Sequence, residues 1–205
     1  MTDATAIILA GGRSRRMGSD KAAARLDGRT MLNWVIEACR ELRARVVVVA
    51  APGQELEDLP RNAEVVRDEV AGRGPLAGIL TGMAAVKAEG GATLLLACDH
   101  PLVRAPLLRL LLASLDEHSA VVPVADGRTQ PLCAAVSLRA LPLLRAAFED
   151  GTRAASVLVD LPGARLLPIT EWRGADPDEL SFFGVNTPDQ LARAEAIVRW
   201  LYEPN

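Results

Sequence analysis

The sequence is poor in aromatic residues and in cysteine. Phenylalanine, tyrosine and tryptophan make up 3% of the 205 residues, so alanine, leucine and valine must fill most of the core of a chain that is 50% hydrophobic. The three cysteines lie far apart and form neither a CxxC pair nor a metal-ligand spacing. We therefore expect Cys39, Cys98 and Cys133 to be small buried hydrophobic residues of a protein in a reducing compartment.

The chain also lacks an excess of basic residues and any long apolar run. Its net charge is −3 with both signs spread along the sequence, which argues against a general nucleic-acid-binding protein. Residues 1–5 lack the basic segment of a signal peptide, and no apolar run is long enough to span a membrane. These features predict a cytoplasmic protein with neither nucleic acid nor membrane as partner. The length predicts a single domain over residues 1–205.

Apolar runs alternate with helical patterns along the chain. Strands are predicted at 4–9, 45–51, 64–66, 93–97, 120–124, 131–136, 165–169 and 182–185. Helices are predicted from Thr30, at 75–88, 106–114, 138–148 and 154–161, and from Thr187 to Tyr202, whereas 172–179 is predicted to be a surface loop. The alternation predicts an α/β fold with a Rossmann-like, mostly parallel sheet and helices on both faces.

The first predicted strand leads into a cationic, glycine-rich loop within residues 6–21. Its glycines and cations are Gly11, Gly12, Arg13, Arg15, Arg16, Gly18 and Lys21. Glycines let a backbone approach a ligand closely, and cations with exposed N–H groups suit a polyanion such as a triphosphate. Five residues separate Gly12 from Gly18, which excludes the Walker A spacing, and the adjacent first glycines exclude the dinucleotide fingerprint. The alternative is a surface turn with solvated arginines, a role to which Arg13 and Arg15 are assigned.

Polar residues follow other predicted strands at Asp68, Asp99 and Asn186. The carboxyl ends of parallel strands share one edge of a sheet, where α/β proteins bind ligands. Asp99 suits Mg²⁺, which takes one or two carboxylates together with phosphate oxygens, although it could instead cap the next connection. Asn186 could equally order the turn before the last helix. Gln130 could bond only the backbone of the hairpin that the turn signal Asp126-Gly127 predicts between the strands at 120–124 and 131–136.

Glycines and histidines elsewhere invite simpler predictions. Gly78 and Gly82 lie four residues apart on one face of the predicted helix at 75–88, which would let this helix approach a neighbour closely. His100 and His118 are predicted to be solvated or capping residues.

Together these segments resemble a known family. Residues 9–21 read Leu-Ala-Gly-Gly-x-Ser-x-Arg-Met-Gly-x-Asp-Lys, which resembles the signature of the molybdenum cofactor guanylyltransferases. Gly-Pro-Leu-Ala-Gly at 74–78, Cys-Asp-x-Pro at 98–101, Gln-Pro-Leu at 130–132 and Val-Asn-Thr-Pro at 185–188 follow in the family's order. The resemblance covers the whole chain and implies a Rossmann-like fold of the nucleotidyltransferase type.

The resemblance implies transfer of GMP from GTP to the terminal phosphate of molybdopterin, with release of pyrophosphate. It implies Mg²⁺ as cofactor, and molybdoenzymes or cofactor-delivery proteins as transient partners. The implied catalytic residues are Arg16, Lys21 and Asp99, of which Asp99 would hold the metal. The implied nucleotide-binding residues are Leu9, Ala10, Gly11, Gly12, Lys21, Asp68, Gly74, Gly78 and Asp99. Gln130 and Asn186 would lie at the acceptor.

The sequence departs from the family pattern in two places. Ala-Ala-Pro at 50–52 stands where the family often has an asparagine that helps to hold the nucleotide, and 133–136 lacks an expected aromatic or basic residue. Cytidine-using relatives resemble Leu-Ala-Ala-Gly at the first turn, so the missing methyl at Gly11 is expected to leave room for a purine.

Two alternatives stay open at this point. One is a nucleotidyltransferase that uses CTP or another phosphate acceptor. The other is a non-catalytic nucleotide or pterin carrier, against which the intact Lys21 and Asp99 argue.

Overall fold

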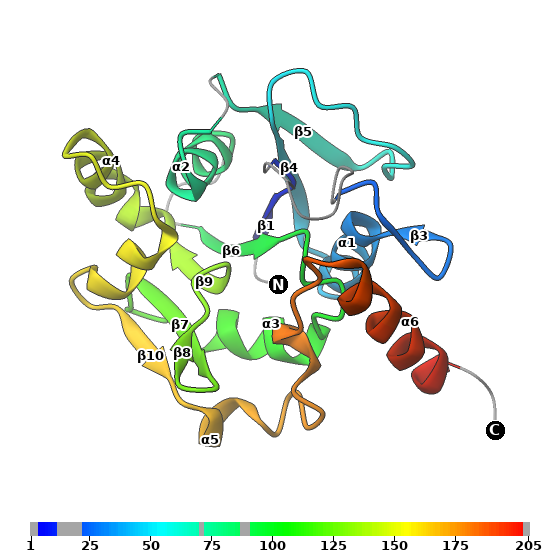
Figure 1. The fold of residues 1–205 in the computed structure, drawn as a ribbon. Coiled ribbons are helices and arrows are strands. Elements are labelled where there is room, and N and C mark those ends of the chain that lie inside the picture. Colours follow the sequence, from blue (N-terminus) through cyan, green and yellow to red (C-terminus); the bar gives the residue numbers. More distant parts are fainter. Residues whose placement is uncertain (1–3, 12–21, 70–71, 87–90, 203–205) are drawn as a thin grey trace.

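The computed structural model describes residues 4–11, 22–69, 72–86 and 91–202. These residues form an eight-stranded sheet in the order β10-β7-β9-β6-β1-β4-β5, with β8 paired to β7 (Figure 1). A separate hairpin consists of β2 (Arg25–Leu26) and β3 (Arg29–Thr30). The strands of the large sheet are β1 (Thr5–Leu9), β4 (Arg45–Ala50), β5 (Ala63–Arg67), β6 (Ala92–Ala97), β7 (Ala120–Ala125), β8 (Arg128–Thr129), β9 (Cys133–Ser137) and β10 (Arg165–Leu167).

The centre of the sheet is parallel, as predicted. Strand β1 pairs in parallel with β4 on one side and with β6 on the other, and β4 pairs in parallel with β5. Strand β9 runs antiparallel between β6 and β7, and β10 is parallel to β7. The chain leaves β1 toward β4 and returns after β5 to the opposite side of β1. Open α/β sheets bind ligands at such a reversal of strand order.

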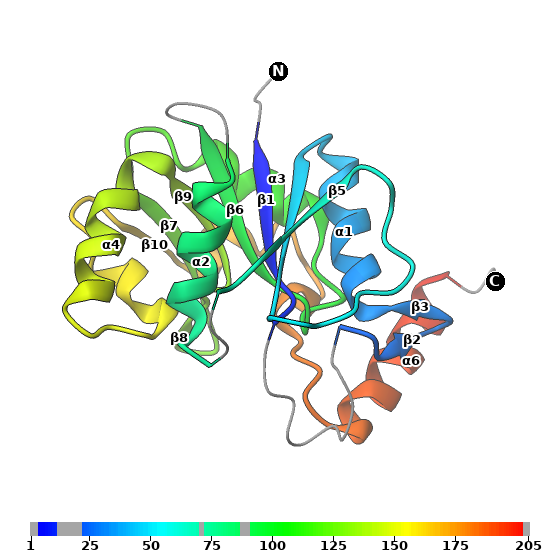
Figure 2. The ribbon, with the colours of Figure 1, turned by 90° about the horizontal axis from the view of Figure 1, so that it is seen from above.

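Helices cover both faces of the sheet (Figures 1 and 2). The helices are α1 (Met31–Glu41), α2 (Pro75–Ala84), α3 (Ala105–Ala113), α4 (Leu141–Glu149), α5 (Ile169–Trp172) and α6 (Pro188–Tyr202). Alternate residues of β1 point to opposite faces of the sheet. Ile8 belongs to the core cluster under α1 and α3, and Ile7 belongs to the cluster under α2 and α4. Within the described ranges, no helix is both long and apolar enough to cross a membrane.

Helix α2 lies directly on β1 because glycines, which have no side chain, occupy the positions of the helix that face the strand. A Cβ atom at Gly82 would overlap Cγ2 of Ile7, and one at Gly78 would lie 3.1 Å from Cδ2 of Leu9. The predicted close approach is therefore confirmed, and it brings the start of α2 to the carboxyl end of the sheet.

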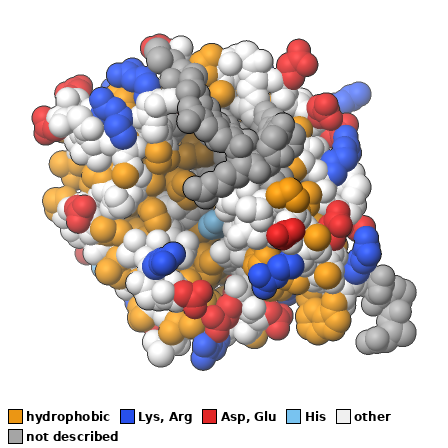
Figure 3. All heavy atoms as spheres, in the orientation of Figure 1, with side chains coloured by type: hydrophobic (Ala, Val, Ile, Leu, Met, Phe, Trp, Pro, Cys, Tyr) orange, Lys and Arg blue, Asp and Glu red, His pale blue; other side chains and the backbone are white. Residues whose placement is uncertain are grey.

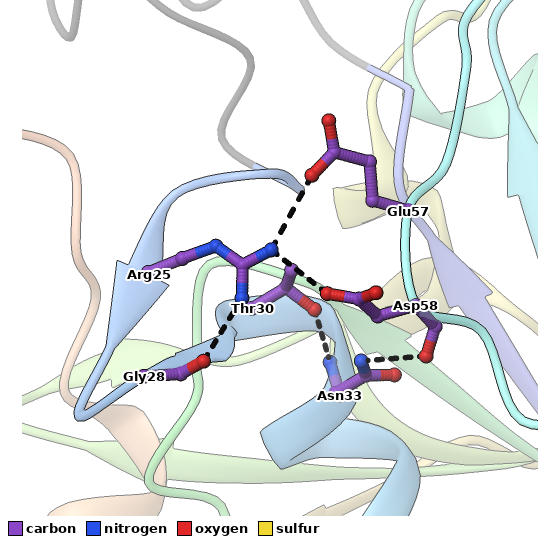
Figure 4. A network of polar contacts seen from close by, with 6 residues as sticks. All are labelled: Arg25, Gly28, Thr30, Asn33, Glu57 and Asp58. Atoms are coloured by element: carbon purple, nitrogen blue, oxygen red, sulfur yellow. Dashed lines mark hydrogen bonds and ion pairs between the residues drawn. The ribbon is translucent and has the colours of Figure 1, made fainter.

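The β2–β3 hairpin is joined to the loop after β4 by polar contacts (Figure 4). Arg25 donates hydrogen bonds to Oδ2 of Asp58 at 2.8 Å and to the carbonyl of Gly28 at 2.9 Å. The hydrogen bond to Asp58 raises the pKa of the Arg25 guanidinium, which holds its proton and its charge in this network. Thr30 ends the hairpin and caps α1, because its side chain accepts a hydrogen bond from the Asn33 N–H.

Helix α6 begins as its sequence predicts. Oγ1 of Thr187 accepts a hydrogen bond from the Gln190 N–H, and Oε1 of Gln190 accepts one from the Asn186 N–H at 2.7 Å. The first bond satisfies an N–H group that the first helical turn leaves without a helical partner, and the second ties the residue before the cap to the helix. Asn186 is thereby held at the entrance of the helix.

Two predictions between β9 and α6 are wrong. Residues 182–185 do not form a strand, because the 3-10 helix η3 (Leu180–Phe182) turns the chain and Phe183 N–H bonds back to Leu180. The predicted helix at 154–161 is the 3-10 helix η2 (Ala155–Asp160), and a further 3-10 turn, η1 (Leu138–Ala140), precedes α4.

The predicted surface loop at 172–179 is a turn segment with exposed residues at 173, 174, 177 and 178, but two of its residues are anchored in the core. Trp172 is fully buried, and its indole N–H donates a 3.0 Å hydrogen bond to the carbonyl of Val124. Asp176 is 1% exposed and its carboxylate accepts hydrogen bonds from the N–H groups of Leu180 and Ser181. A carboxylate that is satisfied by backbone donors can be buried, which the polar character of the segment did not indicate.

Candidate active site

A cavity of about 420 Å³ lies at the carboxyl ends of the central parallel strands. Residues 9–11 after β1, Ala51 after β4 and Asp68 after β5 border it on one side. The start of α2, residues 72–78, forms another wall, and residues 97–99 and Leu132 complete the lining. On the face that Figure 3 shows, hydrophobic side chains gather mainly on the left half, and charged side chains of both signs are scattered around them.

The turn after β1 is held against the end of β4. The N–H groups of Ala10 and Gly11 both donate to the carbonyl of Val49, at 2.9 and 3.2 Å. A Cβ atom at Gly11 would lie 2.9 Å from the Ala51 nitrogen. Glycine at this position therefore allows two strand ends to approach each other. The sequence alone suggests that the missing methyl group at Gly11 leaves room for a purine. In the structure, a methyl group added at Gly11 would meet the Ala51 backbone.

Gln54 bridges the same two strand ends, and the sequence analysis missed it. Its Nε2 donates to the carbonyl of Ala10 at 3.1 Å, and its Oε1 accepts from the Ala51 N–H at 2.9 Å. Arg67 donates to the carbonyls of Gln54 and Ala51 and holds this loop from the β5 side. The side-chain amide thus supports the turn in a sequence that lacks the family's asparagine at 50–52.

Asp68 stands at the end of β5 with one carboxylate oxygen already in contact with α2. Its backbone N–H donates to Ala50, and its Oδ1 accepts a 2.7 Å hydrogen bond from the Thr81 hydroxyl. A Cβ atom at Gly78 would lie 3.6 Å from Oδ2 of Asp68. Asp68 and Gly78 therefore meet in the cavity wall, as their predicted role requires.

Gly74 starts α2 in a conformation and a space that only glycine suits. Its φ angle is 86°, and a Cβ atom there would lie 2.7 Å from the carbonyl oxygen of Arg153. That carbonyl accepts the Leu76 N–H at 3.1 Å, so the segment before η2 supports the first turn of α2. Pro75 occupies the first helical position as predicted.

Asp99 and Asn186 come together although 86 positions separate them in the sequence. The Val185 N–H donates a 2.8 Å hydrogen bond to the carbonyl of Asp99, which draws the segment before α6 to the end of β6. The space above Gly184 is bordered by Nδ2 of Asn186 and Nε2 of His100, at 3.2 and 3.5 Å from a Cβ atom built there. Asp99 lines the cavity, and Asn186 lies next to it.

His100, which the sequence predicts to be a solvated or capping residue, lies beside Asp99. Its side chain is 19% exposed, and its Nε2 lies 4.0 Å from Oδ1 of Asp99. The local sequence gives no such indication, because the residues that cover His100 belong to the segment before α6. His118 is half-buried and away from the cavity, and its Nδ1 lies 3.2 Å from the carbonyl oxygen of Gly163.

The donor set around Asp99 fits magnesium better than a metal that is held by protein side chains alone. Within the described ranges, no three Asp, Glu, His or Cys residues converge on a point. The carboxylate of Asp99 lines the cavity, and Asn186 lies beside Asp99 without lining the cavity among the described residues. Mg²⁺ commonly takes one or two protein carboxylates and completes its shell with water and substrate phosphate oxygens, so this sparse set is sufficient.

The cavity brings together most of the predicted residues that are described. Leu9, Ala10, Gly11, Asp68, Gly74, Gly78 and Asp99 all line it. Gln130 does not line it among the described residues: its N–H bonds to Pro123 and its carbonyl accepts the Cys133 N–H, which is the hairpin role considered as the alternative. Gly12, Arg16 and Lys21 lie outside the described residues.

Comparisons with known proteins agree with this arrangement. Residues 6–164 match the family model described as the MobA-like NTP transferase domain. A molybdenum cofactor guanylyltransferase of Desulfosudis oleivorans is 32% identical over 201 residues, which cover 97% of this chain and 98% of the relative. A protein with the same name from Cereibacter sphaeroides is 34% identical over 196 residues, 94% of this chain and 96% of its own.

Solved structures show the same fold. Molybdopterin-guanine dinucleotide biosynthesis protein A from Archaeoglobus fulgidus superposes with a TM-score of 0.81 at 28% identity, over 96% of this chain and 99% of its own. A 2-C-methyl-D-erythritol 4-phosphate cytidylyltransferase from Thermus thermophilus superposes with a TM-score of 0.71 at 22% identity, over 97% and 100% of the two chains, and supports the fold alone. The chain belongs to the family of MobA-like NTP transferases.

Proposed function

We propose that this protein transfers GMP from GTP to the terminal phosphate of molybdopterin. The observation that carries the proposal is the cavity at the reversal of strand order, with Asp68 on one wall and Asp99 on another, in a chain alignable along nearly its whole length with relatives named molybdenum cofactor guanylyltransferase. In this proposal the Asp68 side of the cavity takes the hydrogen-bond donors of the nucleoside, and the Asp99 side takes a metal together with the phosphates.

The reaction is a direct in-line displacement. A phosphate oxygen of molybdopterin attacks the α-phosphorus of GTP, a new P–O bond forms, and the bond from that phosphorus to the bridging oxygen of the β-phosphate breaks. Pyrophosphate leaves with the electron pair of that bond. Such chemistry depends mainly on positioning and on neutralisation of charge.

The residues divide these tasks. Residues 9–12 would contact the guanine and ribose, and Asp68 would accept hydrogen bonds from the nucleoside. Arg16 and Lys21 would bind phosphate oxygens, and Asp99 would hold Mg²⁺ beside Asn186. The metal, when bound, supplies positive charge to the phosphate oxygens.

The direct test is pyrophosphate release by the purified protein with molybdopterin and each of GTP, CTP and UTP. We expect release with GTP and formation of the guanine dinucleotide. Release with CTP in its place would support a cytidylyltransferase, and GTP binding without release would support the carrier alternative. The assay should include molybdopterin with and without molybdenum.

Asp99→Ala tests the metal assignment. We expect a loss of turnover of at least about a hundredfold that excess GTP does not restore, because the metal-held charge acts on the reacting phosphates. Steady-state kinetics over a GTP series measures this, and Asp150→Ala, on the exposed end of α4, is the control. Near-normal turnover of Asp99→Ala would remove Asp99 from the metal site.

We also propose that residues 1–205 act as one domain, since the core clusters on the two faces belong to the same sheet. A cytoplasmic location and transient transfer of the product to molybdoenzymes or delivery proteins complete the proposal. Co-purification of the product with a recipient apoprotein would test the transfer.

A further inference from the structure

Thr81 connects the middle of α2 to the cavity through Asp68. Its hydroxyl donates a 2.7 Å hydrogen bond to Oδ1 of Asp68, and the two side chains are half-buried. Thr81 itself is not among the residues that line the cavity in the described part of the chain, whereas Asp68 is. The hydroxyl therefore acts on a cavity residue from behind.

Helix α2 treats the two oxygens of the carboxylate differently. One turn before Thr81 the helix carries Gly78, which also lines the cavity, and a Cβ atom built at Gly78 would lie 3.6 Å from Oδ2 of Asp68. The Asp68 backbone is fixed in turn by its N–H bond to the carbonyl of Ala50 at 3.0 Å. The main chain and Oδ1 of Asp68 are thus held by hydrogen bonds, and Oδ2 lies beside Gly78 in the wall of the cavity.

This arrangement selects the kind of group that Asp68 can bind. An ionised carboxylate only accepts hydrogen bonds, and the Thr81 hydroxyl supplies one donor to Oδ1. The base and ribose of a nucleotide present N–H and O–H donors, whereas its ionised phosphates present acceptors that a carboxylate repels. The Asp68 wall therefore suits the nucleoside half of the ligand.

We propose that Thr81 is a positioning residue that orients the Asp68 carboxylate toward hydrogen-bond donors on the nucleoside part of the substrate. The inference rests on the proposed function and deepens it, because it assigns part of the nucleotide selectivity to α2. Without the hydroxyl, the Asp68 carboxylate can rotate, and the free energy of nucleotide binding then includes the entropic cost of ordering the carboxylate.

The test compares nucleotide binding by Thr81→Val, which removes the hydroxyl at nearly constant volume, with Thr81→Ser, which keeps it. We expect the GTP dissociation constant of Thr81→Val to rise roughly tenfold and that of Thr81→Ser to stay within about twofold of the original. Thr93→Val is the matched control, because it also loses a buried hydroxyl hydrogen bond, to Val136, from the opposite end of β6. We expect it to lower the melting temperature without a change in GTP affinity.

A double-mutant cycle separates positioning from a structural role. In an Asp68→Ala background, Thr81→Val should have no further effect on GTP binding, because the residue through which it acts is gone. Inosine triphosphate and 2′,3′-dideoxy-GTP each lack donors of the nucleoside. At least one should bind the original protein more weakly than GTP, and Thr81→Val should shrink that difference.

Three results would overturn the inference: an unchanged GTP affinity in Thr81→Val, an equal loss of affinity in the Asp68→Ala background, or full affinity of the original protein for both analogues. Failure of the proposed function has a different signature, namely GTP binding without pyrophosphate release in the presence of molybdopterin. Binding and turnover are measured separately, so the two failures are distinguishable.

Discussion

Gln54 illustrates how a single side chain supports this site. It lies 44 positions from Ala10 in the sequence, yet its amide hydrogen-bonds the carbonyl of Ala10 and the N–H of Ala51 at once. Gly11 stands between these contacts with no room for a methyl group. The backbone that faces the cavity is therefore held by a close approach and by an amide that does not itself line the cavity among the described residues.

We expect Gln54→Leu to raise the GTP dissociation constant roughly tenfold, because both backbone groups lose their side-chain partner and the turn loosens. Equilibrium binding of GTP, with the melting temperature measured in parallel, checks this. Gln54→Glu is the matched variant: it can still accept from Ala51 but cannot donate to Ala10, so we expect it to weaken binding as well. Unchanged GTP affinity in Gln54→Leu would show that the turn keeps its shape without the amide.

No sequence pattern pointed to Gln54 or Thr81. Each acts through a partner that is distant along the chain, and glutamine or threonine in a loop or helix is ordinarily unremarkable. The glycines were easier to predict, because Gly78 and Gly82 share a helix face and Gly74 precedes a proline at a helix start. The position of His100 beside Asp99 was not predicted, since the segment that packs against it is contributed from the other end of the chain.

At the scale of elements, α2 carries more of the site than any other helix of the described chain. Its first residues line the cavity, Thr81 contacts Asp68, and Gly82 allows the helix to lie on β1. Its position is set by the absence of side chains at two places. A larger residue at Gly82 would move the helix away from β1 and with it Gly78 and Thr81.

Gly82→Ala tests this directly. The added methyl would overlap Cγ2 of Ile7, so we expect the free energy of unfolding to fall by about 2–3 kcal/mol and GTP binding to weaken. Urea unfolding measures the first effect. Gly174→Ala is the matched control, because nothing lies within 4 Å of a Cβ atom built there, and we expect it to change stability little. Equal stability of the two variants would mean that α2 can move at no cost.

The β2–β3 hairpin shows an element that the sequence could have predicted. Asp27 and Gly28 adopt positive φ angles of 49° and 76°, and Asp126 and Gly127 adopt 49° and 69° in the β7–β8 turn. The second Asp-Gly pair was used to predict a hairpin and the first was not. The strands of the first hairpin are two residues each, too short for an alternating pattern to be visible.

At the scale of the whole molecule, the buried cysteines link stability to pH. Burial raises the pKa of the Cys133 thiol to about 12 from 9.0, and burial also raises the pKa of Cys39. Both residues are buried as predicted. In the unfolded chain the thiols ionise above about pH 9, whereas in the folded protein they stay protonated, so the unfolded state binds fewer protons there.

Stability should therefore fall as the pH rises from about 9 toward 12, by up to about 1.4 kcal/mol per pH unit for each thiol. Below about pH 9 the thiols contribute no pH dependence. Urea unfolding at pH 8, 9 and 10 measures the slope, and the Cys39→Ala/Cys133→Ala double variant corrects for other titrating groups. A slope that is the same in both proteins would mean that these thiols ionise equally well in the folded state.

The sequence by itself determined the elements and the chemistry at their ends. Valine-rich and leucine-rich runs specify the central strands, Thr30 and the Thr187–Gln190 segment specify helix starts, and glycines or acids follow the strands. These features depend on residues that are neighbours along the chain. Their local patterns are therefore visible without a fold.

Only the tertiary structure decided which of these ends meet. The order β5-β4-β1-β6 places Asp68 and Asp99 on walls of one cavity, and the bond from Val185 to Asp99 brings Asn186 to the same edge. The contacts of Thr81 with Asp68 and of Gln54 with Ala10 follow from that order and from the close packing of α2. The physical reason is that strand order and helix approach minimise the free energy of the whole core, which no local segment encodes.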